Sequence, residues 1–142
     1  MFTNILLPVD LDQESSWERA LPAAVEVSQK AGARLHVMTV VPDYGMSIVG
    51  SFFPENYEAK ALENAAAALH TFVQAHVPKR IQVRHVVGHG TVYAEILREA
   101  QEVHADLIVL AAHRPALKDF LLGPNAARVV RHANCSVLVV RP

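Results

Sequence analysis

The 142-residue chain contains one cysteine, Cys135, and lacks any long apolar run. A lone cysteine cannot form an internal disulfide, and the first residues lack the basic and apolar segments of a secretory leader, so we expect a cytosolic protein. The longest apolar run, residues 107–112, falls far short of the ~18 residues that a membrane-spanning helix needs. We therefore expect no membrane span, and a packed, unreactive thiol at Cys135.

The chain also lacks an excess of charge of either sign. Lysine and arginine number 13 against 14 acidic residues, so no global positive field is available to hold nucleic acid or an anionic bilayer. The short basic groups at residues 79–80 and at Arg128, Arg131 and His132 are interpreted as solvated surface. The eight histidines show no HxxxH pair on a predicted helix and no zinc-finger spacing, and we expect no metal site.

Half of the residues are hydrophobic (51%) and only 19% are charged, which is typical of a folded domain with one core. Short apolar runs rich in β-forming residues alternate with longer helical stretches. Several of these runs are apolar at nearly every position, as a parallel sheet covered on both faces requires. We predict five strands, at residues 5–9, 35–41, 81–87, 107–111 and 137–140.

Four helices are predicted to follow the strands, over residues 15–31, 57–76, 91–104 and 124–133. The first begins at Ser15 or Ser16, with Ser15 as its N-cap, and stops at Gly32. Pro22 falls inside this helix, and we expect a bend near residues 18–22. Thr91 is the expected N-cap of the third helix.

The alternation of strands and helices implies right-handed crossovers between parallel strands. We therefore predict one doubly wound α/β domain over residues 1–142, with helices on both faces of the sheet. Residues 42–56 form a long irregular segment with two glycines and apolar side chains. Such a segment serves either as a lid or partner contact or as simple surface packing.

In an open parallel sheet, ligands bind beyond the carboxyl ends of the strands. Pro8, Val9 and Asp10 lie at the end of the first strand. The Asp10 carboxylate could accept hydrogen bonds from an adenine amine or a ribose hydroxyl, or could instead cap the following turn. After the fourth strand, residues 111–128 combine small residues, basic side chains and a glycine before a helix. These are the components of a phosphate cradle, although Gly-Pro is also an ordinary helix start.

Five segments, in this order, resemble the universal stress protein family over the whole length of the chain. They are residues 4–10, 36–41, 90–97, 105–110 and 122–141. The shortened His113-Arg114-Pro115 loop and the Gly123-x-Asn125 turn resemble the F/G-type branch of bacterial members. The resemblance implies a five-stranded parallel sheet of order 3-2-1-4-5, with ATP or a related adenine nucleotide bound between the first and fourth strands.

By this resemblance, base and ribose are bound by Pro8, Val9, Asp10, Val40 and Leu110. The phosphate side comprises Ala111, His113, Arg114, Gly123, Pro124 and Asn125. In the family this turn carries the pattern G-x2-G-x9-G-[ST], of which only Gly123 is intact here. Ala111 stands at the first glycine, the second falls in a deletion beside Arg114, and Pro124 replaces the Ser/Thr.

Pro124 is the most consequential of these departures, because it removes both a hydroxyl and a backbone N–H that would point at phosphate oxygens. Asn125 could donate in place of the missing hydroxyl, and His113 or Arg114 could supply charge. We therefore expect weak phosphate binding beside an intact base pocket.

The resemblance also implies a homodimer that pairs through the final strand, from Ser136 to Arg141. The leading interpretation is a small dimeric stress-response protein that signals through bound nucleotide. The alternative is a dimeric interaction module that has lost nucleotide binding and contacts an unidentified client protein. A hydrolase of adenylate-type substrates rests on fold analogy alone. No Ser-His-Asp set, paired carboxylates or P-loop lysine indicates an enzyme, and the resemblance allows at most slow ATP hydrolysis or self-phosphorylation.

Overall fold

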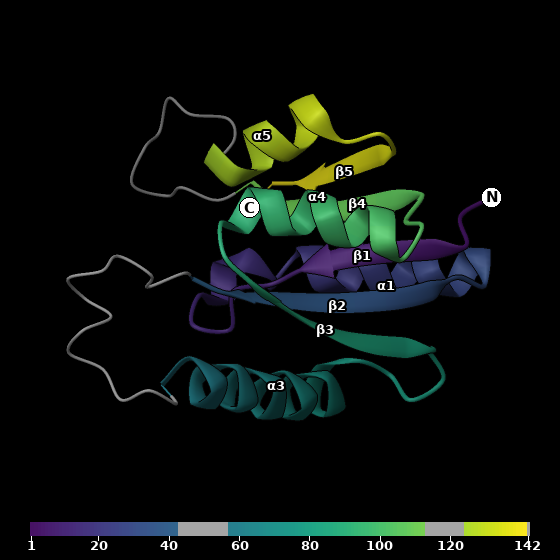
Figure 1. The fold of residues 1–142 in the computed structure, drawn as a ribbon. Helices are drawn as coiled ribbons and strands as arrows, with labels where there is room; N and C mark the ends of the chain where they lie inside the picture. Colours follow the sequence, from purple (N-terminus) through teal and green to yellow (C-terminus); the bar gives the residue numbers. More distant parts are fainter. Residues whose placement is uncertain (43–56, 113–123, 142) are drawn as a thin grey trace.

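Five parallel strands form one sheet in the order β3-β2-β1-β4-β5 (Figure 1). The strands are β1 (Asn4–Pro8), β2 (Arg34–Val41), β3 (Val83–His89), β4 (Leu107–Ala111) and β5 (Ser136–Val140). This computed structural model describes residues 1–42, 57–112 and 124–141. The fold class and strand order predicted from the sequence are confirmed, and β1 lies at the centre of the sheet.

Helices cover both faces of this sheet. They are the 3₁₀ helix η1 (Glu14–Ser16), α1 (Ala20–Ala31), α3 (Tyr57–His76), α4 (Val92–Glu102) and α5 (Pro124–His132). One cluster of buried residues joins α1 and α3 to one face, through Ile5 and Leu7 among others. A second cluster joins α4 and α5 to the opposite face and includes Leu6. Because side chains alternate along a strand, β1 contributes fully buried residues to both cores.

The first predicted helix is wrong in its opening part. Ser15 lies inside η1, and Arg19 occupies the N-cap position of α1 without a side-chain cap bond. The reason is local, because the Ser16 hydroxyl binds the β1–η1 loop instead. It accepts from the Asp10 N–H at 2.9 Å and donates to the Gln13 carbonyl oxygen at 2.7 Å. A short 3₁₀ turn and a break therefore precede the α-helix.

The bend predicted near residues 18–22 overlaps the break at residues 17–19 between η1 and α1. Pro22 itself lies in the first turn of α1, where a backbone N–H has no partner within the helix. The helix ends at Gly32 as predicted, with φ 65° and ψ 30°. Glycine adopts this left-handed conformation without strain. Trp17, in the break before α1, packs edge-on against Phe72 of α3 with ring centroids 4.9 Å apart. The break is therefore held against α3.

The strand β3 begins and ends two residues later than predicted. Ile81 belongs to the preceding turn, where its N–H donates to the Pro78 carbonyl oxygen at 3.1 Å. The strand instead continues to His89, which pairs with the last residue of β2. A pattern of apolar residues cannot locate the end of a strand whose last residue is polar. Thr91 lies at the N-cap of α4, as predicted, but makes no side-chain cap bond, and the helix ends at Glu102.

At the amino ends of the strands, Asp106 joins the segment before β4 to the start of β1. Its Oδ2 accepts from the Thr3 N–H at 2.8 Å and from the Thr3 hydroxyl at 2.9 Å. Its Oδ1 accepts from the Asn4 N–H at 3.1 Å, and its own N–H donates to the Asn4 carbonyl oxygen at 2.9 Å. These bonds fix the two central strands at the end opposite to the helix N-termini.

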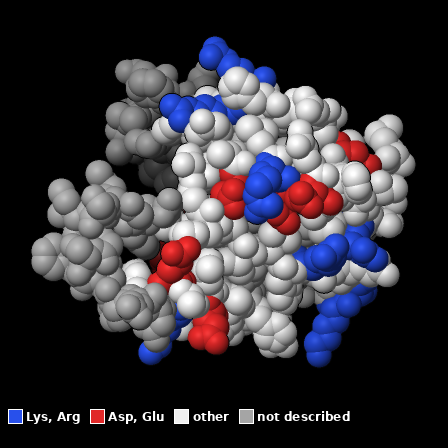
Figure 2. Space-filling model, viewed as in Figure 1, with Lys and Arg blue, Asp and Glu red and all other residues white. Residues whose placement is uncertain are grey.

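The surface carries charges of both signs. On the face seen in Figure 2, lysine and arginine side chains and carboxylates form small separate groups, in agreement with the net charge of −1. Within the described residues, no helix is both long and apolar enough to cross a membrane. The predicted irregular segment lies, from residue 43 to residue 56, outside the described residues.

Candidate functional site

A cleft of about 640 Å³ lies at the carboxyl end of the sheet. This volume is within the range of small-molecule binding sites. Its walls come from the β1–η1 loop, the ends of β2 and β4, the first residues of α4 and α5, and part of α3. The cleft therefore occupies the position beside the central strand, where strand order reverses and open parallel sheets bind ligands.

The loop after β1 forms one wall of the cleft. Val9 is buried, and its N–H donates to the Met38 carbonyl oxygen at 2.7 Å, which ties the loop to β2. Asp10 is exposed, its N–H donates to Ser16 Oγ at 2.9 Å, and its Oδ1 accepts from the Asp12 N–H at 3.0 Å. The turn-capping role of Asp10 is therefore present. It does not exclude a ligand, because an ionised carboxylate has about four acceptor positions.

The floor of the cleft is apolar. It includes Pro8 at the end of β1, Met38 and Val40 of β2, and Leu110 of β4. Met38 is fully buried and Leu110 is 6% exposed. Ile96 of α4, almost fully buried, packs in the same core cluster below them. This floor suits the face of a flat apolar ring.

The opposite wall is formed by β4 and the start of α5. Ala111 ends β4, and the N–H of the next residue, Ala112, donates to the Val140 carbonyl oxygen at 2.9 Å, which holds this wall to β5. Pro124 and Asn125 are the first two residues of α5, and both are exposed in the cleft. Pro124 has no N–H to offer, whereas the first backbone N–H groups of a helix, such as that of Asn125, have no acceptor within the helix.

The cleft brings together most of the residues predicted to bind nucleotide. From the base and ribose side these are Pro8, Val9, Asp10, Val40 and Leu110, and from the phosphate side Ala111, Pro124 and Asn125. His113, Arg114 and Gly123 lie outside the described residues. The role of each residue toward a ligand stays a prediction.

Three residues of α3 also line the cleft and are not among the predicted site residues. They are Asn64, Ala65 and Ala68. Their helical spacing places them on one face, but it does not show what that face meets. The position of α3 is set by Leu69 and Phe72, which pack into the core at the edge of the sheet, and only this packing brings the face to the cleft.

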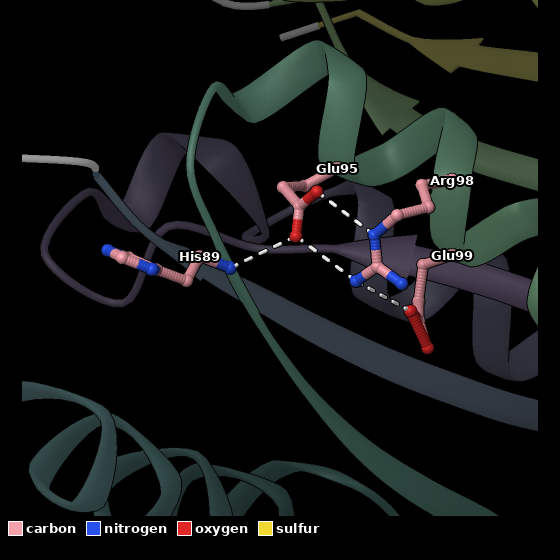
Figure 3. A network of polar contacts seen from close by, with 4 residues as sticks. All are labelled: His89, Glu95, Arg98 and Glu99. Carbon is pink, nitrogen blue, oxygen red and sulfur yellow. Dashed lines mark hydrogen bonds and ion pairs between the residues drawn. The ribbon is translucent and has the colours of Figure 1, made fainter. Parts of the chain in front are cut away.

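A polar network beside the cleft joins β3 to α4 (Figure 3). Glu95 Oε1 accepts from the His89 N–H at 3.1 Å and from Arg98 Nη2 at 3.1 Å, while Oε2 accepts from Arg98 Nε at 3.0 Å. The hydrogen bond from Arg98 is the main cause that holds the pKa of Glu95 below its ordinary value. At Gly88, an added Cβ would lie 2.8 Å from Met38 Cε and 3.3 Å from Glu95 Cβ, so a larger residue there would displace the Met38 side chain at the cleft floor.

The described lining of the cleft is acidic at its rim. Asp10 and Asp12 are its charged side chains, and it includes no lysine or arginine. A cation lies nearby at the contact between α4 and α5, where the Arg128 guanidinium carbon is 4.8 Å from the centroid of the Tyr93 ring. Across the part of the chain that the structure describes, no group of three or more histidine, cysteine or acidic side chains could hold a metal ion.

Comparison with known proteins agrees with this geometry. The sequence model of the universal stress protein family matches residues 1–141. Universal stress protein G of Escherichia coli O157:H7 is 30% identical over 143 residues, covering 99% of this chain and 100% of the relative. The structure of the universal stress protein UspA from Lactobacillus plantarum gives a TM-score of 0.71 at 26% identity, over 98% of this chain and 97% of that chain.

Two further solved structures of the same fold contain adenine nucleotides. One is a universal stress protein in complex with cAMP, with a TM-score of 0.60 at 21% identity over 99% of this chain and 97% of that chain. The other is the universal stress protein from Archaeoglobus fulgidus in complex with dAMP, with a TM-score of 0.63 at 22% identity over 96% of each chain. The family match over residues 1–141 and the full-length relative confirm the resemblance read from the sequence, and the chain belongs to the universal stress protein family.

Proposed function

We propose that the protein binds an adenine nucleotide in this cleft and that the adenosine half supplies most of the affinity. The observation that carries the proposal is the convergence of three strand ends on one cleft. Pro8, Asp10, Val40 and Leu110, which the family resemblance assigns to base and ribose, all line it. The apolar floor suits the adenine ring, and the Asp10 carboxylate can accept from a ribose hydroxyl or the adenine amine.

The ligands of the related structures support the same chemical class. One relative is described with cAMP and another with dAMP, and both ligands carry adenine on a sugar phosphate. The phosphate side here is expected to bind more weakly, because Pro124 offers neither a hydroxyl nor an N–H. The described lining also contains two aspartates and no lysine or arginine. Adenosine, AMP and ATP are therefore expected to differ in affinity by less than about tenfold, the equivalent of one good phosphate hydrogen bond.

The first test is direct. The protein purified from cells is extracted with acid to look for a co-purified nucleotide, and the emptied protein is titrated with adenosine, AMP and ATP by calorimetry. Asp10→Ala should weaken all three ligands together by about tenfold, because each loses the same acceptor. Asp10→Asn is the control: it removes the charge but retains an oxygen that can accept from the Asp12 N–H. Comparison of the two variants therefore distinguishes the effect of losing the charge from the effect of losing the turn. Parent protein that binds no adenine ligand at millimolar concentration contradicts the proposal.

A second candidate function is a dimeric interaction module without a nucleotide, in the cytosol. The observation that favours it is the exposed apolar edge strand β5, in which Leu138 is 37% exposed and the valines are half-buried. Pro124 at the phosphate turn favours it as well. A dimer that forms without nucleotide, together with no binding in the titrations above, would support this function over the first.

A further inference from the structure

Arg128 and Tyr93 form a cation–π contact at the junction of α4 and α5, with the guanidinium carbon 4.8 Å from the ring centroid. An aromatic face restricts a guanidinium to few orientations and leaves its edge free to donate hydrogen bonds. Among the described residues, no carboxylate forms an ion pair with Arg128. The contact therefore holds a cation in place without neutralising it.

The position of this cation relative to the cleft follows from the two helices. Arg128 lies one turn after Pro124, which lines the cleft, and helical side chains lean back toward the N-terminus of their helix. Tyr93 lies in the first turn of α4, directly after Val92, which also lines the cleft. The guanidinium therefore lies against the first turn of α4, next to residues of α4 and α5 that line the cleft, whereas Arg128 and Tyr93 do not themselves line it.

A cation would stabilise an anion at this mouth, and the cleft lining does not provide one among the described residues. Asp10 and Asp12 are its charged groups, and Pro124 lacks the N–H that a helix start usually offers. The N-termini of α4 and α5 add only partial positive charge. Arginine suits a phosphate because its planar fork donates two parallel hydrogen bonds.

We propose that Arg128, oriented by Tyr93, binds the phosphate of the nucleotide in the cleft. This inference rests on the proposed function and deepens it, because it makes the protein prefer a nucleotide over the free nucleoside. It also assigns the phosphate to a side chain of the last helix. Tyr93 is then a positioning residue that acts through Arg128.

The test compares Arg128→Gln with Arg131→Gln, since both arginines are exposed on α5 and the second lies one turn nearer its C-terminus. Calorimetric titration with AMP and with adenosine is expected to show about fivefold weaker AMP binding by Arg128→Gln, with adenosine unchanged, as the loss of one exposed charge-assisted contact predicts. Arg131→Gln should leave both ligands unchanged. Tyr93→Phe should retain AMP affinity, and Tyr93→Leu should lower it while sparing adenosine.

Other outcomes overturn the inference. An unchanged ratio of AMP to adenosine affinity in Arg128→Gln shows that the guanidinium does not contact phosphate. An equal loss in Arg131→Gln shows a diffuse field of the helix instead of a specific contact. Loss of adenosine and AMP together, with a normal melting temperature, assigns Arg128 to another role. Parent protein that binds neither ligand refutes the proposed function itself, a result that differs from all of these.

Discussion

At the scale of single residues, His36 is the least expected side chain in the core. It is 1% exposed, its Nε2 lies 3.1 Å from Asn4 Oδ1, and its Nδ1 is buried without a hydrogen-bond partner. Burial, followed by the positive charges of Arg84 and Arg34, lowers the pKa of His36 from 6.5 to about 4. The folded protein therefore holds this imidazole neutral at every pH above that value.

The consequence is a loss of stability in mild acid. The unfolded chain takes up a proton at His36 near pH 6.5, and the folded chain takes it up only near pH 4. The free energy of unfolding is therefore highest above pH 6.5 and falls as the pH decreases toward 4. Between pH 7.5 and 5 the free energy of unfolding, measured with urea, should fall by about 2 kcal/mol.

His36→Gln should remove most of this pH dependence, whatever its effect on stability at pH 7.5. His85→Gln is the comparison variant. The pKa of His85 is also lowered by partial desolvation, but its side chain is exposed, so this variant should remove a smaller part of the pH dependence. The carboxylates with lowered pKa values, Glu95 and Asp106, titrate below this window and do not interfere. If His36→Gln keeps the full slope between pH 7.5 and 5, the explanation is wrong.

Pro124 is the residue whose substitution should change ligand preference most simply. Pro124→Ser restores an N–H and a hydroxyl at the first position of α5. We expect ATP to bind about fivefold tighter, because phosphate oxygens gain charge-assisted donors, while adenosine is unaffected. Calorimetry with both ligands measures the effect, and Ala127→Ser, which adds a hydroxyl elsewhere on α5, is the control. Equal tightening of adenosine and ATP would show that the substitution acts on the cleft as a whole.

At the scale of elements, the junction of β3 and α4 depends on Glu95. Its carboxylate side chain is 15% exposed and binds both the His89 N–H and the Arg98 guanidinium. Glu95→Gln should lower the free energy of unfolding by about 1 to 2 kcal/mol, because a charge-assisted bond becomes a neutral one. Glu99→Gln is a matched control, since Glu99 contacts Arg98 at 3.3 Å but not His89.

Hydrogen exchange gives the local readout of the same prediction. The His89 amide should exchange faster in Glu95→Ala than in the parent, because its acceptor is gone, and should be unaffected in Glu99→Gln. The pKa of Glu95 is lowered in the folded protein, so the stabilisation is present above pH 4.5 and is lost as the pH falls below it. An unchanged exchange rate of the His89 amide in Glu95→Ala would show that Glu95 does not protect this amide.

The strands were predictable because their chemistry is local. Runs such as Leu107–Ala111 are apolar at every position, as a parallel strand buried on both faces requires. Element boundaries were harder to predict. The end of β3 at His89 depends on pairing with β2, which is distant in sequence. The break before α1 depends on the hydrogen bond that the Ser16 hydroxyl accepts from the Asp10 N–H. The part of the candidate site that lies at the strand ends, such as Pro8 and Asp10, could be predicted, whereas Asn64 could not, because its place in the cleft depends on how α3 packs.

At the scale of the whole molecule, the exposed edge of β5 is the clearest sign of a partner. Its Leu138 is 37% exposed, and an uncovered apolar edge strand invites pairing with another strand. We expect a homodimer joined through β5, and Leu138→Lys should shift it toward monomer in light scattering at micromolar concentration. Val130→Lys, on α5 at 44% exposure, should not. A parent protein that is monomeric at this concentration, or a dimer insensitive to Leu138→Lys, contradicts strand pairing.

The Asp106 clamp and the cleft lie at opposite ends of β1, a strand whose five residues span about 16 Å. Substitutions separated by more than about 10 Å usually have additive effects. Variation at the mouth of the sheet can therefore accumulate without weakening the bonds of Asp106 to Thr3 and Asn4, which hold the central strands together. Residues around the cleft can therefore change without loss of the fold.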